Sequence, residues 1–447
     1  MVKIYKLHKI SGISAGIILL ILSVSGFFLD HDKWSFLYTT TFSSVPSQIK
    51  SSEKRLFNAY YKDKENAQHI LVGGYRGLFE SFNGGKKFSN ISNLQILSII
   101  PDKSILYLAT SDGIYSYNFK HLKRVALQGE YITALSVSKK QLVAVLDKEK
   151  LVTIDKNNLQ ISNETIVKIT KEALKEDIKL SRLVRDLHYG RGLFDGGISL
   201  LINDYGALVL AFLSLSGYMI WFLIKRKKYP QISRKLIKTH ANIFAIIAII
   251  PLFILSVTGI FLDHSSGLAK FMNSVKIPHS TLPPIYNSLR SDIWSVDFDG
   301  KTYRIGNRYG IYKSTNLKNW RLENRGLAYK MIRRDGILYV SGMGAPNRIY
   351  KDNKFYLLPD TPHMFRDILV KDKEVRYFSS MQKGFYLPQF HDITLYTLLL
   401  TLHDGTFFSS WWGWINDFAA IALILLGITG TMRWSIKKRK NLNKVHK

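Results

Sequence analysis

The strongest constraint on this chain is a set of four long apolar stretches, at residues 10–29, 205–224, 241–262 and 418–432. Most of them are close to the ~20 residues that an α-helix needs to cross ~30 Å of membrane hydrocarbon. The fourth stretch is shorter, and we expect it to begin near Trp412 or Trp414, in the aromatic belt of the interface. The sequence therefore predicts an α-helical integral membrane protein with four transmembrane helices.

Basic residues gather at one end of every apolar stretch. They occur in segments 3–9, 225–238 and 437–440. Since Lys and Arg are enriched in cytoplasmic loops, we expect both termini and the short middle loop to be cytoplasmic. The two long connections, about 30–200 and 263–412, then lie outside. The first stretch begins with basic residues like a signal peptide, but it has no clear small-x-small cleavage site and we expect it to stay uncleaved.

An internal repeat relates the two halves of the chain. The segment LSVSGFFLDH at 22–31 matches LSVTGIFLDH at 255–264, and each span has a His at its inner end. The second copy carries one extra residue between that His and the outer motif. Pro251 lies in this interval, so we expect a π-bulge there to absorb the insertion.

The second and fourth stretches match each other as well. LHYGRGLF at 187–194 corresponds to LHDGTFF at 402–408, and the pair Asn203-Asp204 corresponds to Asn416-Asp417. We expect these Asn-Asp pairs to cap the N-termini of their helices, with contact to a bound cofactor as the alternative. Both copies leave the cytoplasm and return, so the repeats are parallel and a pseudo-two-fold axis along the membrane normal is expected.

The long connections read as short strands with Gly, Asn and Asp turns. The segment 81–88, SFNGGKKF, resembles an Asp-box hairpin in which Asn replaces Asp, and 314–320, STNLKNW, is a shorter version. We expect a β-rich, propeller-like periplasmic domain. The predicted segments are a first helix (1–32), the first half of the β-rich domain (33–186), a juxtamembrane segment and second helix (187–228), a cytoplasmic loop (229–239), a third helix (240–264), the second half of the β-rich domain (265–400), a juxtamembrane segment and fourth helix (401–436) and a cytoplasmic tail (437–447).

Composition excludes several kinds of site. The chain has no cysteine, which rules out disulfides, Fe–S clusters, thiolate metal sites and covalent haem attachment. Its net charge is +30, from 63 Lys and Arg against 33 Asp and Glu. Because part of this charge lies beside the apolar stretches and no nucleic-acid motif is present, we expect membrane lipid headgroups as partners and no nucleic acid.

Six of the twelve His occupy matched positions in the two repeats. The pairs are His8 with His240, His31 with His264 and His188 with His403. Lone His residues near span ends are usually interfacial hydrogen-bonding residues, but three symmetric pairs favour a functional site. Paired neutral imidazoles suit a six-coordinate haem iron. Asp30 and Asp263 adjoin the middle pair, so zinc at the outer face remains an alternative.

These motifs resemble the PepSY-associated transmembrane family. The resemblance rests on LHYGRGLF and LHDGTFF, each followed by a span, and on an inner His followed by small residues and (S/T)G. Members of this family include inner-membrane, haem-binding reductases that release iron from ferric siderophores. The resemblance implies one or two b-type haems held by His8, His240, His188 and His403, with His31 and His264 as alternative outer ligands.

The resulting hypothesis is a haem b oxidoreductase of the bacterial inner membrane, acting on a periplasmic ferric siderophore or chelate. No nucleotide- or flavin-binding motif is evident, so quinol or a separate cytoplasmic reductase would donate the electrons. One alternative is a non-redox binding or sensory protein whose outer domain recruits a partner. A permease is a third reading, less favoured because the repeats are parallel and only four spans are predicted.

Overall fold

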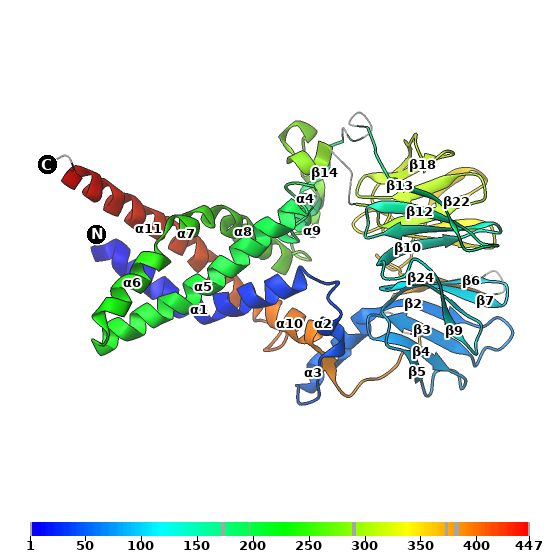
Figure 1. Cartoon of the computed structure of the whole chain (residues 1–447), viewed down its shortest axis with the longest axis horizontal. Coiled ribbons are helices and arrows are strands. Elements are labelled where there is room, and N and C mark those ends of the chain that lie inside the picture. Colours follow the sequence, from blue (N-terminus) through cyan, green and yellow to red (C-terminus); the bar gives the residue numbers. More distant parts are fainter. Residues whose placement is uncertain are drawn as a thin grey trace. The chain divides into compact units, whose positions relative to one another are not determined.

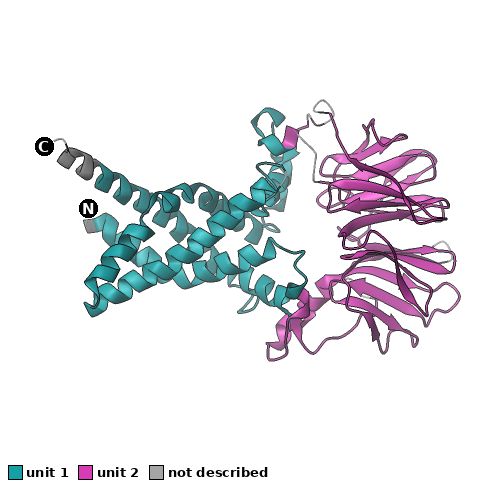
Figure 2. Cartoon of the chain, in the orientation of Figure 1, with its two compact units in different colours: residues 1–37, 177–285, 394–447 teal, residues 38–176, 286–393 magenta. Residues whose placement is uncertain are grey.

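The computed structural model describes residues 2–170, 174, 176–195, 197–287, 292–371, 374–379 and 384–445. The chain forms two compact units, each built from separated stretches of sequence (Figure 2). A helical unit comprises residues 1–37, 177–285 and 394–447, and a β-rich unit comprises residues 38–176 and 286–393.

Three helices of the helical unit are long and apolar enough to cross a membrane (Figure 1). They are α1 (Val2–Leu29), α5 (Ile198–Arg226) and α11 (Gly413–Val445). A bent pair, Pro230–Ile247 with Ile249–Asp263, passes the same test and is bent by 70°. The described residues thus contain three candidate spans, or four if the bent pair is one span.

The predicted π-bulge near Pro251 is wrong. Instead, the helix is interrupted twice, which divides it into α6 (Pro230–His240), α7 (Ile243–Ile247) and α8 (Ile249–Asp263). The Asn242 side chain caps α7 by accepting a hydrogen bond from the Ala245 amide at 2.9 Å. Pro251 lies in the first turn of α8, where its missing N–H leaves no hydrogen bond unmade. The breaks absorb the inserted residue.

Close packing joins the helices of this unit. α1 packs against both α5 and α11, around a core that includes Ala15, Leu19 and Leu210. A Cβ atom at Gly16 would lie 2.8 Å from the Tyr218 ring, and the Tyr218 hydroxyl donates to the Ile13 carbonyl at 2.7 Å. Small residues on α1 are therefore needed for the approach of α5.

Two short helices precede α5 and α11. They are α4 (Leu180–His188), which packs on α8, and α10 (Leu395–His403), which packs on α1. The remaining short elements are α2 (Phe36–Thr39), β1 (Thr41–Phe42), α3 (Ser47–Lys50), η1 (Ser51–Leu56), β14 (Ile178–Lys179), α9 (Ala269–Ser274), β15 (Lys276–Ile277), η3 (His279–Thr281), η4 (Pro284–Asn287) and β26 (Ile393–Thr394).

The β-rich unit contains six antiparallel sheets within the residues that are described. The first three are β2–β5 (Phe57–Lys62, Ile70–Gly74, Gly77–Ser81, Ser89–Ser92), β6–β9 (Ile96–Asp102, Ile105–Thr110, Gly113–Tyr117, Leu122–Ala126) and β10–β13 (Ile132–Val137, Gln141–Leu146, Lys150–Asp155, Ile161–Ile166). The others are β16–β19 (Ser295–Phe298, Tyr303–Gly306, Gly310–Ser314, Arg321–Arg325), β20–β23 (Lys330–Arg334, Ile337–Ser341, Arg348–Lys351, Lys354–Leu357) and β24–β25 (Asp367–Lys371, Glu374–Phe378).

These sheets are the blades of one β-propeller. The first strand of each sheet packs beside the first strand of the next, and β24 packs beside β2 to close the ring. Both long connections of the sequence contribute blades to this ring. Strands such as β11 are apolar and buried on both faces, because each blade is covered by its two neighbours.

The Asp-box-like segments form tight turns. Ser81 Oγ donates to Asn83 Oδ1 at 2.9 Å, and Asn83 Oδ1 accepts from the Lys87 amide at 2.9 Å. Gly85 supplies the positive φ of 88° that the turn requires. Asn316 accepts from the amides of Lys318 and Asn319 in the second copy. Asn therefore performs the turn-closing role of the usual Asp, and these segments are structural.

Candidate functional site

Four of the six matched His are held in the same way inside the helical unit. The Nδ1 atom of each lies within hydrogen-bonding distance of a Ser or Thr hydroxyl on a neighbouring long helix. The distances are 2.8 Å for His8 and Thr429, 2.7 Å for His240 and Ser216, 2.9 Å for His403 and Ser25, and 3.1 Å for His188 and Thr258. Residues at matched positions of the two sequence repeats thus make matched contacts.

The hydroxyl groups determine which His nitrogen carries the proton. Thr429 and Thr258 each donate their single hydroxyl proton to a carbonyl of their own helix at 2.7 Å, and Ser25 does so at 2.6 Å. Ser216 donates to the Leu213 carbonyl at 3.3 Å. The oxygens of Thr429, Thr258 and Ser25 are then the acceptors, and Nδ1–H of His8, His188 and His403 is the donor. Nε2 keeps its lone pair, which is the form of imidazole that binds a metal.

A glycine follows each of these hydroxyl residues and lies against the imidazole, most closely at Gly26. A Cβ atom added at the glycine would lie close to the His Cε1 atom. The distances would be 3.2 Å for Gly26 and His403, 3.5 Å for Gly259 and His188, 3.6 Å for Gly430 and His8, and 3.7 Å for Gly217 and His240. Each of the four His side chains therefore contacts one (S/T)-Gly pair on a neighbouring helix.

His188 and His403 come together. Their ring centroids are 6.2 Å apart, with the ring planes at 60°. Two imidazoles that share one metal ion need a similar separation, roughly 6 Å, because each metal–nitrogen bond is about 2 Å long. Burial lowers the pKa of His188, with a further lowering by the His403 ring, and burial also lowers the pKa of His403. Both rings are thus kept in the neutral form.

The prediction that Asn203 and Asn416 cap their own helices is wrong. α5 and α11 begin earlier than expected, so both Asn side chains lie within their helices. Asn203 Nδ2 donates to the His188 carbonyl and Asn416 Nδ2 to the His403 carbonyl, each at 3.0 Å. These contacts satisfy the C-terminal carbonyls of α4 and α10 and fix the two His-bearing ends.

His31 and His264 have different surroundings. His31 Nδ1 donates to the Phe27 carbonyl at 2.8 Å, and its Nε2 lies 3.6 Å from Asp204 Oδ2. His264 Nε2 lies 2.6 Å from Asp417 Oδ2. The Nε2 atoms of this pair face carboxylates rather than open space. Within the described part of the chain, no ring contact joins His31 to His264 or His8 to His240, and no group of three or more His, Asp or Glu has an arrangement suited to a metal ion.

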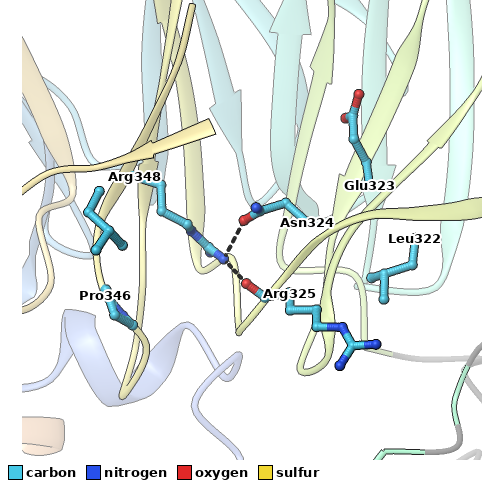
Figure 3. Close-up of a pocket in the computed structure, with 7 residues that line it drawn as sticks. Leu322, Glu323, Asn324, Arg325, Pro346 and Arg348 are labelled. Atoms are coloured by element: carbon cyan, nitrogen blue, oxygen red, sulfur yellow. Dashed lines mark hydrogen bonds between the residues drawn. The ribbon is translucent and has the colours of Figure 1, made fainter. Parts of the chain in front are cut away.

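A pocket in the β-propeller has a structural explanation. Its volume is about 540 Å³, and it is lined by residues of β19, β22 and β23 and by Pro346 (Figure 3). The Arg348 guanidinium donates to Asn324 Oδ1 and to the backbone carbonyls of Arg325, Gly326 and Leu327. Arg348 therefore ties two blades together, and none of the predicted site residues lies in this pocket.

The helical unit defines a membrane protein whose helices hold four half-buried imidazoles against (S/T)-Gly pairs. The chain belongs to the family described as PepSY-associated TM region, whose profile matches residues 121–437. That match confirms the resemblance seen in the spans. Comparison with curated proteins gave no match.

Several solved structures match this chain at low sequence identity. A computationally designed protein, Ika8, is 8% identical over 72% of this chain and 80% of its own, with a TM-score of 0.32. The Neurospora crassa Pan2 WD40 domain is 10% identical over 64% and 59%, with a TM-score of 0.27. BamB from Moraxella catarrhalis is 9% identical over 62% and 64%, with a TM-score of 0.26. The chain spans less than two thirds of the last two, and such low TM-scores carry no functional information.

Sequence reasoning did not identify Ser25, Ser216, Thr258 and Thr429 as the partners of the His residues, and it expected Asp204 and Asp417 only within capping pairs. Each of the four hydroxyl residues precedes a Gly, and this is the signal in the sequence that could have found them. The sequence does not indicate which His contacts which hydroxyl, because the two residues of each contact lie on different helices.

Proposed function

We propose that this protein is a haem b oxidoreductase that carries electrons across the bacterial cytoplasmic membrane to a ferric chelate. The observation that supports this most is the set of four imidazoles whose Nδ1 atoms are each bonded to a Ser or Thr hydroxyl. Such imidazoles are ready to act as axial ligands of iron. The 6.2 Å separation of His188 and His403 supports one shared iron between them.

The proposed topology has four spans in two parallel repeats, with the bent helix pair as the third span. Both termini and the 229–239 loop would be cytoplasmic, because the basic segments lie at these ends. The propeller would then be periplasmic. Matched hydrogen bonds at matched repeat positions support the parallel arrangement.

The His would form two ligand pairs at different depths. His8 and His240 would hold one haem near the cytoplasm, and His188 and His403 would hold the other near the outer face. His8 and Ser25, the partner of His403, both lie on α1 and are separated by roughly 25 Å at ~1.5 Å per residue. One helix therefore supports both sites and sets the distance between them.

When bound, haem b would supply a one-electron couple at each depth. The residues of the chain hold the imidazoles neutral, orient them through Nδ1 and pack the helices around them. Each ferric ion of the chelate accepts one electron and becomes ferrous, which weakens its binding to oxygen ligands that prefer the harder ferric ion. Quinol or a cytoplasmic reductase would be the electron donor, and the net charge of +30 would attract an anionic chelate.

The first test is a dithionite-reduced minus oxidised visible spectrum of the detergent-purified protein, with haem quantified per chain. A sharp b-type signal is expected, with two haems per chain if both sites are filled. A flat spectrum, for protein from cells supplied with haem, would contradict the redox function and favour the non-redox binding or sensory alternative. Haem without reduction of a ferric chelate would indicate that another protein accepts the electrons.

Removing one hydroxyl should change the potential of one haem without removing it. In Ser25→Ala, His403 Nδ1–H loses its acceptor, so the imidazole becomes a poorer donor to ferric iron. A hydrogen bond contributes ~0.5–1.5 kcal/mol, and 59 mV corresponds to ~1.4 kcal/mol for one electron. We expect the midpoint potential of one haem to rise by roughly 20–60 mV in a redox titration.

The control for this variant is Ser23→Ala. Ser23 lies on the same helix and is similarly buried, but among the described residues its hydroxyl bonds only to the Leu20 carbonyl. Both potentials should stay at their wild-type values in this control. An equal shift in both variants, or none in Ser25→Ala, would show that Ser25 does not tune His403.

A further inference from the structure

A second candidate site lies in the middle of the β-propeller. A cavity of about 50 Å³ is lined by the first strands of the blades, including parts of β6, β10, β16 and β20, together with the start of β24. Since these first strands form the closed inner ring, the cavity lies on the propeller axis. No residue of the proposed haem sites takes part in it.

Positive charge exceeds negative charge around this cavity. Its lining contains the four cations Lys330, Arg333, Arg334 and Arg366, and the two carboxylates Asp297 and Asp367. Both carboxylates already have an arginine partner. Arg333 binds Asp297 through two nitrogens at 2.8 and 2.6 Å, and Arg334 lies 3.4 Å from Asp367. Among the described residues, no ion pair joins Lys330 or Arg366 to a carboxylate, although the Asp367 carboxylate acts on Lys330 over a longer distance.

Several hydrogen-bond donors at the cavity are also unused. In the described residues, the Lys330 ammonium donates only to the Leu97 carbonyl, at 2.9 Å. Arg366 donates through Nη1 to the carbonyls of Arg55 and Phe57 and to Asn58, and no acceptor among the described residues bonds to its Nε or Nη2. The Ser98 hydroxyl lines the cavity, is buried and has no hydrogen-bond partner.

The excess of positive charge at the cavity favours a bound counter-ion, since Lys330 and Arg366 are half-buried and the two carboxylates already pair with Arg333 and Arg334. Burial lowers the pKa of Lys330 to about 8, with Arg366 acting in the same direction and Asp367 in the opposite one. Water could solvate the donors but could not neutralise the charge.

We propose that the propeller axis binds one small inorganic anion of about the size of chloride, held by Lys330, Arg366 and the Ser98 hydroxyl. A cavity of about 50 Å³ exceeds the ~10–15 Å³ that one water requires and accommodates a halide. It is too small for a ferric chelate. This site is therefore separate from the proposed electron acceptor, and it does not depend on the presence of haem.

The anion links blades that are far apart in sequence. Ser98 belongs to the second blade, Lys330 to the fifth, and Arg366 immediately precedes the sixth. A bound anion would therefore stabilise the closed ring. Lys330 is the best residue to change, because a methionine keeps its length and removes its charge.

Chloride is the probe for the experiment. Thermal unfolding of the full-length protein in detergent is followed through the β-sheet amide I band in infrared spectra, which reports on the propeller. Chloride is titrated against gluconate at constant ionic strength. We expect chloride to raise the unfolding temperature of the wild-type propeller by about 5 °C at saturation, because a ligand that binds only the folded state stabilises it.

Three variants locate the effect. Lys330→Met should unfold at the same temperature in both salts, and in gluconate it should be no less stable than the wild type. Ser98→Ala should need several-fold more chloride for the same shift, and it serves as the test if Lys330→Met does not fold. Lys123→Met, at an exposed position of β9, should keep the full wild-type response. Equal wild-type stability in both salts, or an unchanged chloride response in Lys330→Met, would overturn the proposal.

Discussion

A His403→Ala variant is expected to bind one haem fewer per chain than the wild-type protein. His403 is the partner of His188, with ring centroids 6.2 Å apart, and one imidazole alone cannot supply both axial ligands. The lost haem should be the outer one. The measurement is haem per chain together with a redox titration, in which one of the two potentials should disappear while the other is retained.

His31→Ala is the informative control for that variant. His31 lies in the same outer region of the repeat, but its Nδ1 donates to the Phe27 carbonyl and its Nε2 faces Asp204. Haem content should therefore be unchanged. Loss of haem in His31→Ala with retention in His403→Ala would reverse the assignment of the outer ligands. Added imidazole should restore haem to a His403→Gly variant if the defect is the missing ligand alone.

An Asp297→Ala variant is expected to destabilise the propeller strongly. Asp297 is 1% exposed, and it accepts hydrogen bonds from Arg333 at 2.8 and 2.6 Å and from Arg304 at 3.4 Å. Removing one partner of a buried ion pair leaves an uncompensated charge and costs about 3–5 kcal/mol. For a unit of this size we expect the unfolding temperature to fall by roughly 10 °C.

The loss should be confined to the propeller. Infrared amide I spectra separate β-sheet unfolding from loss of the helices, and haem content provides an independent check on the helical unit. Glu374→Ala, which removes an exposed carboxylate from β25, is the matched control and should change the unfolding temperature by less than about 2 °C. A similar effect for both variants would mean that Asp297 is not the ion-pair centre of the propeller.

Much of the architecture could be predicted from local sequence patterns. Long apolar runs identified the candidate spans, because crossing a membrane requires a run of about 20 apolar residues within one segment. Ser81, Asn83 and Gly85 indicated a tight turn, since all the atoms that close it lie within a few residues. The equal positions of His8 and His240, and of His188 and His403, indicated matched environments.

Other expectations were incorrect because local patterns did not determine them. Asn203 looked like a helix cap at the edge of an apolar run, yet α5 begins five residues earlier and Asn203 bonds to the end of α4. Pro251 indicated a bulge, but the helix accommodates its extra residue by breaking around Asn242 and Ala248. In both cases packing between helices determined where the helix begins.

The sequence by itself determined the apolar spans, the two repeats and the His positions, because hydropathy and self-similarity are properties of neighbouring residues. Only the tertiary structure decided which hydroxyl receives which imidazole, since His8 and Thr429 are at opposite ends of the chain and meet through helix packing. The tertiary structure also decided that both long connections contribute blades to one closed propeller, and that Ser98 and Lys330 line one cavity. Such contacts depend on how whole elements pack, and no local pattern encodes them.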